Sequence, residues 1–105
     1  MEKYSLLPQY TFQDYEMWDG NWEIISGTAY AMTPLPNFKH QNISQEIATQ
    51  LGNLLANCKK CAPLLPVDWK VADDTILQPD NSVICFPADE DAKYLTQSPS
   101  LIFEI

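Results

Sequence analysis

An amphipathic segment between residues 38 and 58 constrains the fold more than any other part of the chain. Its apolar residues recur at helical spacing: Ile43, Ile47, Leu51, Leu54, Leu55 and Cys58. At about 100° per residue these positions form one stripe, and polar residues such as Asn42 and Glu46 lie outside it. The pattern predicts a helix from about Phe38 to Cys58 that lies across a β-sheet.

The segments around this helix predict strands. Trp22-Glu23-Ile24-Ile25 and Thr28-Ala29-Tyr30-Ala31-Met32 flank Ser26-Gly27, which predicts a hairpin that Pro34 ends. Further strands are predicted over residues 64–71, 76–86 and 101–105. The order predicts an α/β (α+β) fold with a mixed β-sheet and the long helix on one face.

Shorter local signals complete this reading of the chain. Thr11 is a good N-cap, and Asp14 three residues later completes a capping-box-like pattern. A short helix is therefore predicted, with Phe12, Tyr15 and Trp18 as its apolar stripe. The acidic residues between 88 and 93 predict a solvated loop.

Composition limits the class of protein. The 105 residues, of which 46% are hydrophobic, predict a single globular domain over residues 1–105. Apolar runs are too short to span a bilayer, so we expect no membrane partner. Three cysteines are an odd number and too few for a disulfide framework, which favours a cytoplasmic location. The net charge of −8 repels a phosphate backbone, whereas a free nucleic-acid-binding module is usually basic.

Asp80 and Glu104 are the most informative polar residues. Asp80 follows a proline near the start of a predicted strand, and Glu104 interrupts an otherwise apolar one. A charge within an apolar strand is costly unless a metal or another partner compensates it. Two carboxylates on neighbouring strands could hold one divalent cation. Acidic residues at strand ends are also common without any such role, and the spacing alone leaves that alternative open.

Six sequence blocks, in order, carry a resemblance. They are Tyr10-Thr11-Phe12-Gln13-Asp14-Tyr15, Trp22-Glu23-Ile24-Ile25-Ser26-Gly27, Ala29-Tyr30-Ala31-Met32-Thr33-Pro34, His40-Gln41-Asn42-Ile43, Gln78-Pro79-Asp80-Asn81-Ser82-Val83 and Pro99-Ser100-Leu101-Ile102-Phe103-Glu104-Ile105. Together they resemble the Uma2 (Uma-two) family of restriction endonucleases in the PD-(D/E)XK nuclease superfamily. Any single block is weak, but the ordered set covers nearly the whole chain.

The resemblance implies a restriction-endonuclease-like core that hydrolyses phosphodiester bonds of nucleic acid, with DNA as the expected substrate. It implies Mg²⁺ or Mn²⁺ as cofactor, held by Asp80, Glu104 and the backbone carbonyl of Ile105. Glu23 and His40 also fall within family blocks and are further candidate catalytic residues. His40 could instead be a capping or core side chain, and Glu23 a polar position on a half-exposed strand.

The chain also departs from the family pattern. No lysine follows Glu104, Ser26 stands where the family usually has aspartate, and the family's next segments are absent. We therefore expect the N-terminal portion of a Uma2-type domain, incomplete at its C-terminus and truncated or degraded as a nuclease. The alternative is a non-catalytic interaction protein that forms a homodimer or pairs with a complementing chain through its open final strand.

Two further patterns have plainer explanations. Cys58-Lys59-Lys60-Cys61 has the spacing of half a zinc site or a redox pair, but no second pair follows. We expect near-surface free thiols there. Lys70 shares a strand face with Asp68 and is a distant candidate for the missing catalytic lysine.

Overall fold

The computed structural model describes residues 8–32 and 35–105, which form two antiparallel sheets and two helices. The helices are α1 (Phe12–Tyr15) and α2 (Phe38–Leu54). The strands are β1 (Trp22–Ile25), β2 (Thr28–Ala31), β3 (Cys61–Leu64), β4 (Trp69–Ala72), β5 (Thr75–Leu77), β6 (Asn81–Cys85) and β7 (Leu101–Phe103). The predicted α+β class with one long helix is confirmed.

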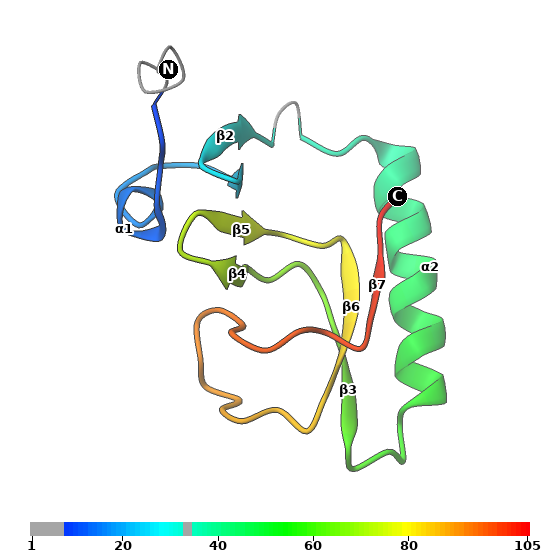
Figure 1. The fold of residues 1–105 in the computed structure, drawn as a ribbon. Helices are drawn as coiled ribbons and strands as arrows, with labels where there is room; N and C mark the ends of the chain where they lie inside the picture. The colour runs from blue at the N-terminus through cyan, green and yellow to red at the C-terminus, as the bar shows by residue number, and fades with distance from the viewer. Residues whose placement is uncertain (1–7, 33–34) are drawn as a thin grey trace.

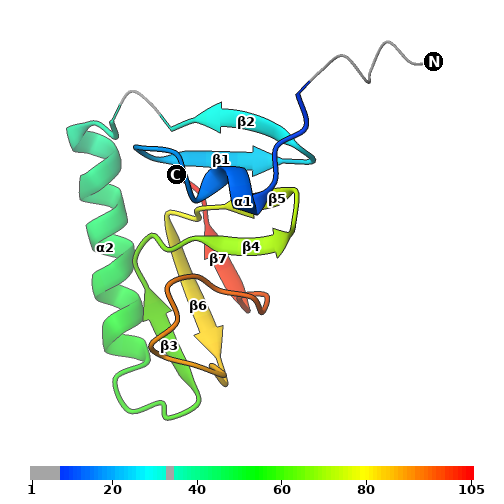
Figure 2. The same cartoon turned by 90° about the vertical axis from the view of Figure 1, so that its left-hand side faces the viewer.

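The strands pair as two separate sheets. The first has the order β2-β1-β5-β4 and the second the order β3-β6-β7. Helix α2 packs against β3 and β6, so it covers the second sheet, while α1 lies beside the first (Figures 1 and 2). The prediction of one mixed β-sheet is therefore wrong, because the strands form two sheets and the strand pairs within both are antiparallel.

Two predicted strands are each divided between the sheets. The segment predicted over 64–71 begins at Leu64, the last residue of β3, and continues in β4 after a break that contains Pro66. The segment predicted over 76–86 is β5 followed by β6, and Pro79 lies in the link of residues 78–80. Proline has no N–H to donate to a ladder, so each break lies where pairing is weakest. Asp80 consequently stands where the chain passes from one sheet to the other.

The hairpin and the first helix form as their sequences predict. Ser26 and Gly27 have positive φ values of 49° and 84°, the signature of a type I′ turn between β1 and β2. The N–H of Thr11 donates to Asp14 Oδ2 at 3.0 Å, which closes the capping box of α1. The helix ends at Tyr15, earlier than predicted. Pro34, which was expected to end the second strand, lies outside the described residues, and β2 ends at Ala31.

The core lies under the first sheet and along β6. Ile24 and Ile76 are completely buried, and they pack with Phe12. Val83 and Ile84 of β6 are also buried, on opposite faces of the strand. Burial of β6 on both faces gives the Asp80 end of this strand a fixed position.

Helix α2 begins as predicted but ends at Leu54 rather than Cys58. Asn37 caps it by accepting a hydrogen bond from the N–H of His40 at 2.9 Å. Leu54, which belongs to the predicted apolar stripe, is 78% exposed, whereas Leu55 beside it is half-buried. The helix therefore ends about one turn before the predicted apolar stripe does.

The cysteine prediction is wrong for two of the three thiols. Cys61 and Cys85 lie opposite each other in β3 and β6 and form a disulfide, whereas Cys58 is free and exposed. The cytoplasmic location stays a prediction that no longer rests on the cysteine count. Neither described helix is long and apolar enough to cross a membrane.

Candidate functional site

Asp80 is the residue on which the candidate site converges. Its Oδ2 atom accepts a hydrogen bond from the backbone N–H of Ile105 at 2.9 Å. Its Oδ1 atom lies 3.3 Å from Nε2 of His40. The link between β5 and β6, the first turn of α2 and the segment after β7 therefore meet at one half-buried carboxylate.

His40 is held in place by the start of α2. Its backbone N–H donates to the Asn37 cap, and its Nδ1 atom lies 3.0 Å from Oε1 of Gln41. The two ring nitrogens thus face oxygen atoms of different side chains. The geometry lets His40 hold a proton at Nε2 beside Asp80.

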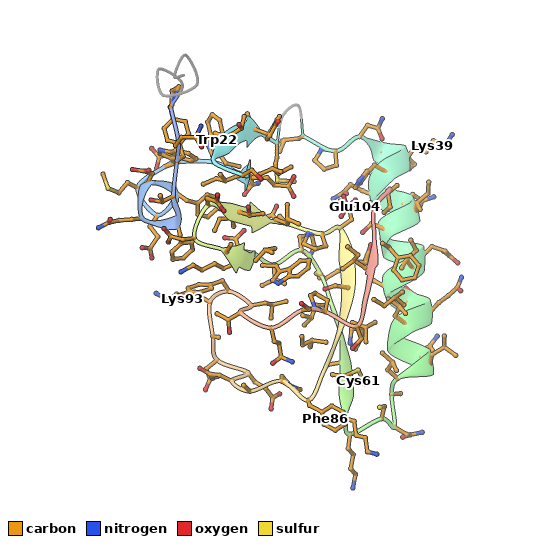
Figure 3. All side chains as sticks on the ribbon, viewed as in Figure 1. Trp22, Lys39, Cys61, Phe86, Lys93 and Glu104 are labelled. Atoms are coloured by element: carbon orange, nitrogen blue, oxygen red, sulfur yellow. A yellow bond between two sulfur atoms is a disulfide. The ribbon has the colours of Figure 1, made fainter. Side chains whose placement is uncertain are left out.

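Glu104 lies just past β7, so it does not interrupt the strand as predicted. Figure 3 shows Glu104 near the N-terminal end of α2, where Lys39 is labelled. Partial burial raises the pKa of the Glu104 carboxyl, and the negative charge of Asp80 raises it further. The charge of Glu23 acts in the same direction, whereas the Asp80 backbone amide and His40 oppose the rise. Glu104 therefore sits in the negative field of two other carboxylates.

Glu23 reaches the site from the first sheet. Its Oε2 atom accepts the backbone N–H of Gln78 at 2.7 Å. This bond ties β1 to the link of residues 78–80 that carries Asp80. The structure thus gathers all the residues predicted for the site, namely Asp80, Glu104, Glu23, His40 and Ile105, around one end of β6.

The carboxylate oxygen atoms at the site suit a hard divalent cation that binds through few protein ligands. Among residues 8–32 and 35–105, no group of three or more histidine, cysteine, aspartate or glutamate side chains is assembled to hold a metal. Mg²⁺ commonly binds through one or two carboxylates, with waters and substrate phosphate completing its shell. Burial is the main cause of the raised Glu104 pKa, and the charge of Asp80 adds to it. A cation between Asp80 and Glu104 would offset that added repulsion.

A buried contact that sequence reasoning missed fixes α2 against β6. Asn81, which is 1% exposed, accepts a hydrogen bond from Ser44 Oγ at 3.0 Å and donates to the Ser44 carbonyl oxygen at 3.4 Å. Asn81 follows Asp80, and Ser44 lies one helical turn after His40. The contact therefore sets the distance between His40 and Asp80. In the sequence, the one sign of this contact was that a polar residue, Asn81, follows Asp80.

A second missed network lies on the other side of the 78–80 link. Asp68 Oδ1 accepts hydrogen bonds from Tyr15 Oη at 2.8 Å and from Gln78 Nε2 at 3.1 Å. Burial, followed by the hydrogen bond and charge of Asp68, raises the pKa of Tyr15 well above its usual range. The tyrosine therefore stays protonated and acts as a fixed donor that supports this link.

Lys70 points away from the carboxylates. Its Nζ atom lies 4.5 Å from the centre of the Phe12 ring and 4.0 Å from Asp73 Oδ1. These contacts belong to the α1 side of the first sheet. The Lys70 amine therefore lies on another side of the sheet from the group of residues around Asp80.

A cleft of about 1020 Å³ opens beside Asp80 and His40. One face of α2 forms one wall. Met32, Leu35 and Leu65 also line the cleft, as does Gln78 close to Asp80. Asp80 and His40 therefore lie on the lining of a cavity large enough for a substrate.

A comparison with protein-family models decides the classification. The model described as "Putative restriction endonuclease", Uma2, matches residues 6–105. The chain belongs to the Uma2 family. This match confirms the resemblance that the six sequence blocks carry.

A solved structure supports the fold of this Uma2 chain. It is described as a "putative nuclease belonging to DUF820" from Anabaena variabilis ATCC 29413, and it is 20% identical in sequence with a TM-score of 0.76. The similarity covers 90% of this chain and 56% of the Anabaena chain. The present chain thus spans little more than half the length of that relative. A search of curated proteins gave no match.

Proposed function

We propose that this Uma2 chain provides the metal-binding residues of a nuclease site that hydrolyses phosphodiester bonds of nucleic acid, with DNA as substrate. The observation that carries the proposal is the convergence of Glu104, His40 and the Ile105 amide on Asp80. Membership of the Uma2 family supports the nuclease class.

Asp80 and Glu104 are the proposed ligands of Mg²⁺ or Mn²⁺, and the backbone carbonyl of Ile105 is a further donor. When bound, such a cation supplies Lewis-acid stabilisation of phosphoryl charge and lowers the pKa of water. The Ile105 N–H aims Oδ2 of Asp80 by holding it at 2.9 Å. That contact gives the carboxylate one orientation before a cation arrives.

The remaining residues have positioning and proton-handling roles in this proposal. His40 holds a proton at Nε2, 3.3 Å from Asp80, where it can pass to a leaving oxygen atom. Glu23 fixes the 78–80 link through the Gln78 amide.

The test is a cleavage assay on labelled DNA with Mg²⁺ or Mn²⁺, alone and with a supplied C-terminal segment of a Uma2 relative. We expect metal-dependent cleavage that Asp80→Asn and Glu104→Gln each abolish. Glu46→Gln, an exposed change on α2, is the matched control and should leave cleavage unchanged. Cleavage that survives Asp80→Asn would overturn the proposed site.

A non-catalytic pairing role is the second candidate, and one observation favours it. Strand β7 has β6 on one side and no further described strand on the other, and Leu101 and Ile102 are 48% and 42% exposed. Such an edge can add a strand from a second copy or a complementing chain. Sedimentation analysis of wild type and Ile102→Lys tests this role, which predicts association that the lysine abolishes.

A further inference from the structure

The cleft beside Asp80 has an unusual lining for a protein that acts on nucleic acid. Its described lining residues include no lysine and no arginine, and its charged or ionisable groups are Asp80 and His40 alone. Proteins that grip duplex DNA neutralise several phosphates with such cations. With a net charge of −8, the chain as a whole adds no compensating field.

Neutral hydrogen-bonding side chains occupy the helical wall instead. Gln41, Ser44, Gln45 and Thr49 recur at spacings that place them on one face of α2, and all line the cleft. Within residues 8–32 and 35–105, neither the Gln45 nor the Thr49 side chain has a hydrogen-bond partner, so both can contact a ligand. Glutamine carries both a donor and an acceptor, the pair that reads the edge of a nucleobase.

Apolar side chains form another part of the lining, and they suit the flat faces of bases. They are Leu35, Pro36, Leu65 and Pro66, and Leu35 and Leu65 are 77% and 64% exposed. Apolar side chains beside amide groups form the kind of pocket that holds an unstacked base. Bases within a duplex are stacked and paired, and they cannot present both edge and face to one cleft.

From this lining we propose that the cleft takes unpaired nucleotides, bases inward, so that the substrate of the site is single-stranded nucleic acid. The inference rests on the proposed nuclease function and specifies its substrate. Base edges contact Gln45 and Thr49, base faces contact the apolar part of the lining, and the scissile phosphate lies beside Asp80. Recognition through neutral groups also makes binding weakly dependent on salt, because few counterions are released.

The test measures fluorescence anisotropy of a labelled single-stranded DNA oligonucleotide and of the same sequence as a duplex. The full chain is used with Ca²⁺, which holds the complex without turnover. We expect the single strand to bind at least about tenfold more tightly, since only it can offer free base edges. Between about 50 and 200 mM salt its affinity should fall less than tenfold, against the 10³-fold or greater loss typical of phosphate-dominated binding.

Paired variants on α2 make the test specific. Gln45→Ala should weaken single-strand binding about fivefold or more, the effect expected for one base-edge contact. Gln50→Ala is the matched control, because Gln50 is exposed and lies on the opposite face of the helix. Circular dichroism of each variant confirms that α2 is intact.

The outcomes separate this inference from the function on which it rests. Equal affinity for duplex and single strand, no binding of either, or equal effects of Gln45→Ala and Gln50→Ala would overturn the single-strand inference. Metal-dependent cleavage of duplex DNA that requires Asp80 would at the same time uphold the proposed nuclease function. Loss of metal-dependent cleavage on every substrate would instead count against that function.

Discussion

The contact between Ser44 and Asn81 is expected to govern both stability and the candidate site. Asn81 is 1% exposed and makes two hydrogen bonds to Ser44, which join α2 to β6 directly after Asp80. Replacing Asn81 with alanine removes both bonds and leaves a small void in a fully buried position. The helix then loses its polar anchor to the strand.

The size of the effect follows from the geometry. Each buried hydrogen bond contributes about 1 kcal/mol net, so Asn81→Ala should lower the free energy of unfolding by about 2 kcal/mol. Ser44→Ala removes one donor and leaves Asn81 Oδ1 without its partner, which costs about 1 to 3 kcal/mol. The double variant lacks the unpaired Asn81 Oδ1 atom. Its loss of unfolding free energy should therefore be about 1 kcal/mol smaller than the sum of the two single losses.

Urea denaturation followed by tryptophan fluorescence measures this double-mutant cycle. Asn53→Ala, an exposed asparagine-to-alanine change on α2, is the control and should cause no loss of stability. A coupling energy near zero between Ser44 and Asn81, or a loss below about 0.5 kcal/mol for Asn81→Ala, would refute the reasoning.

Three further predictions concern the fold and the carboxylates. Reduction of the disulfide between Cys61 and Cys85, which are 24 residues apart, should lower the free energy of unfolding by about 3 to 4 kcal/mol through loop entropy; an unchanged urea midpoint in dithiothreitol would contradict this. Ile24→Ala should cost about 3 kcal/mol because the side chain is fully buried, whereas Ile25→Ala, 45% exposed, should cost well under half as much in the same urea experiment. Because the folded pKa of Glu104 is raised above its ordinary value of 4.5, the folded chain holds this proton longer than the unfolded chain as the pH rises. The free energy of unfolding should therefore fall as the pH rises from 4.5 through the raised pKa, and Glu104→Gln should flatten that fall. An identical pH profile in the variant would contradict the raised pKa of Glu104.

The parts of the fold that follow from local chemistry could be predicted from the sequence. The hairpin needs Ser26-Gly27 at positive φ, and the α2 stripe follows helical periodicity, so neither depends on distant contacts. The division of residues 76–86 between two sheets could not be predicted, since β5 and β6 differ in their partners rather than in their composition. Pro79 marked the place without indicating that the chain changes sheets there.

The candidate site, too, could be predicted from the sequence only in part. Asp80 and Glu104 were identified from the family resemblance, and their proximity follows from the pairing of β6 with β7. The disulfide between Cys61 and Cys85 was missed because it depends on the register of β3 and β6, which an odd cysteine count does not reveal. The Ser44–Asn81 contact joins residues 37 positions apart, and no local pattern links them.

The metal site is best tested by calorimetric titration of Mn²⁺ and Mg²⁺ into the folded wild-type chain and into Asp80→Ala and Glu104→Ala. We expect saturable binding that each of these substitutions abolishes and that Glu46→Ala, an exposed change on α2, leaves intact. Absence of binding in a folded wild-type protein, or binding that survives Asp80→Ala, would contradict the claim that these two carboxylates hold a metal.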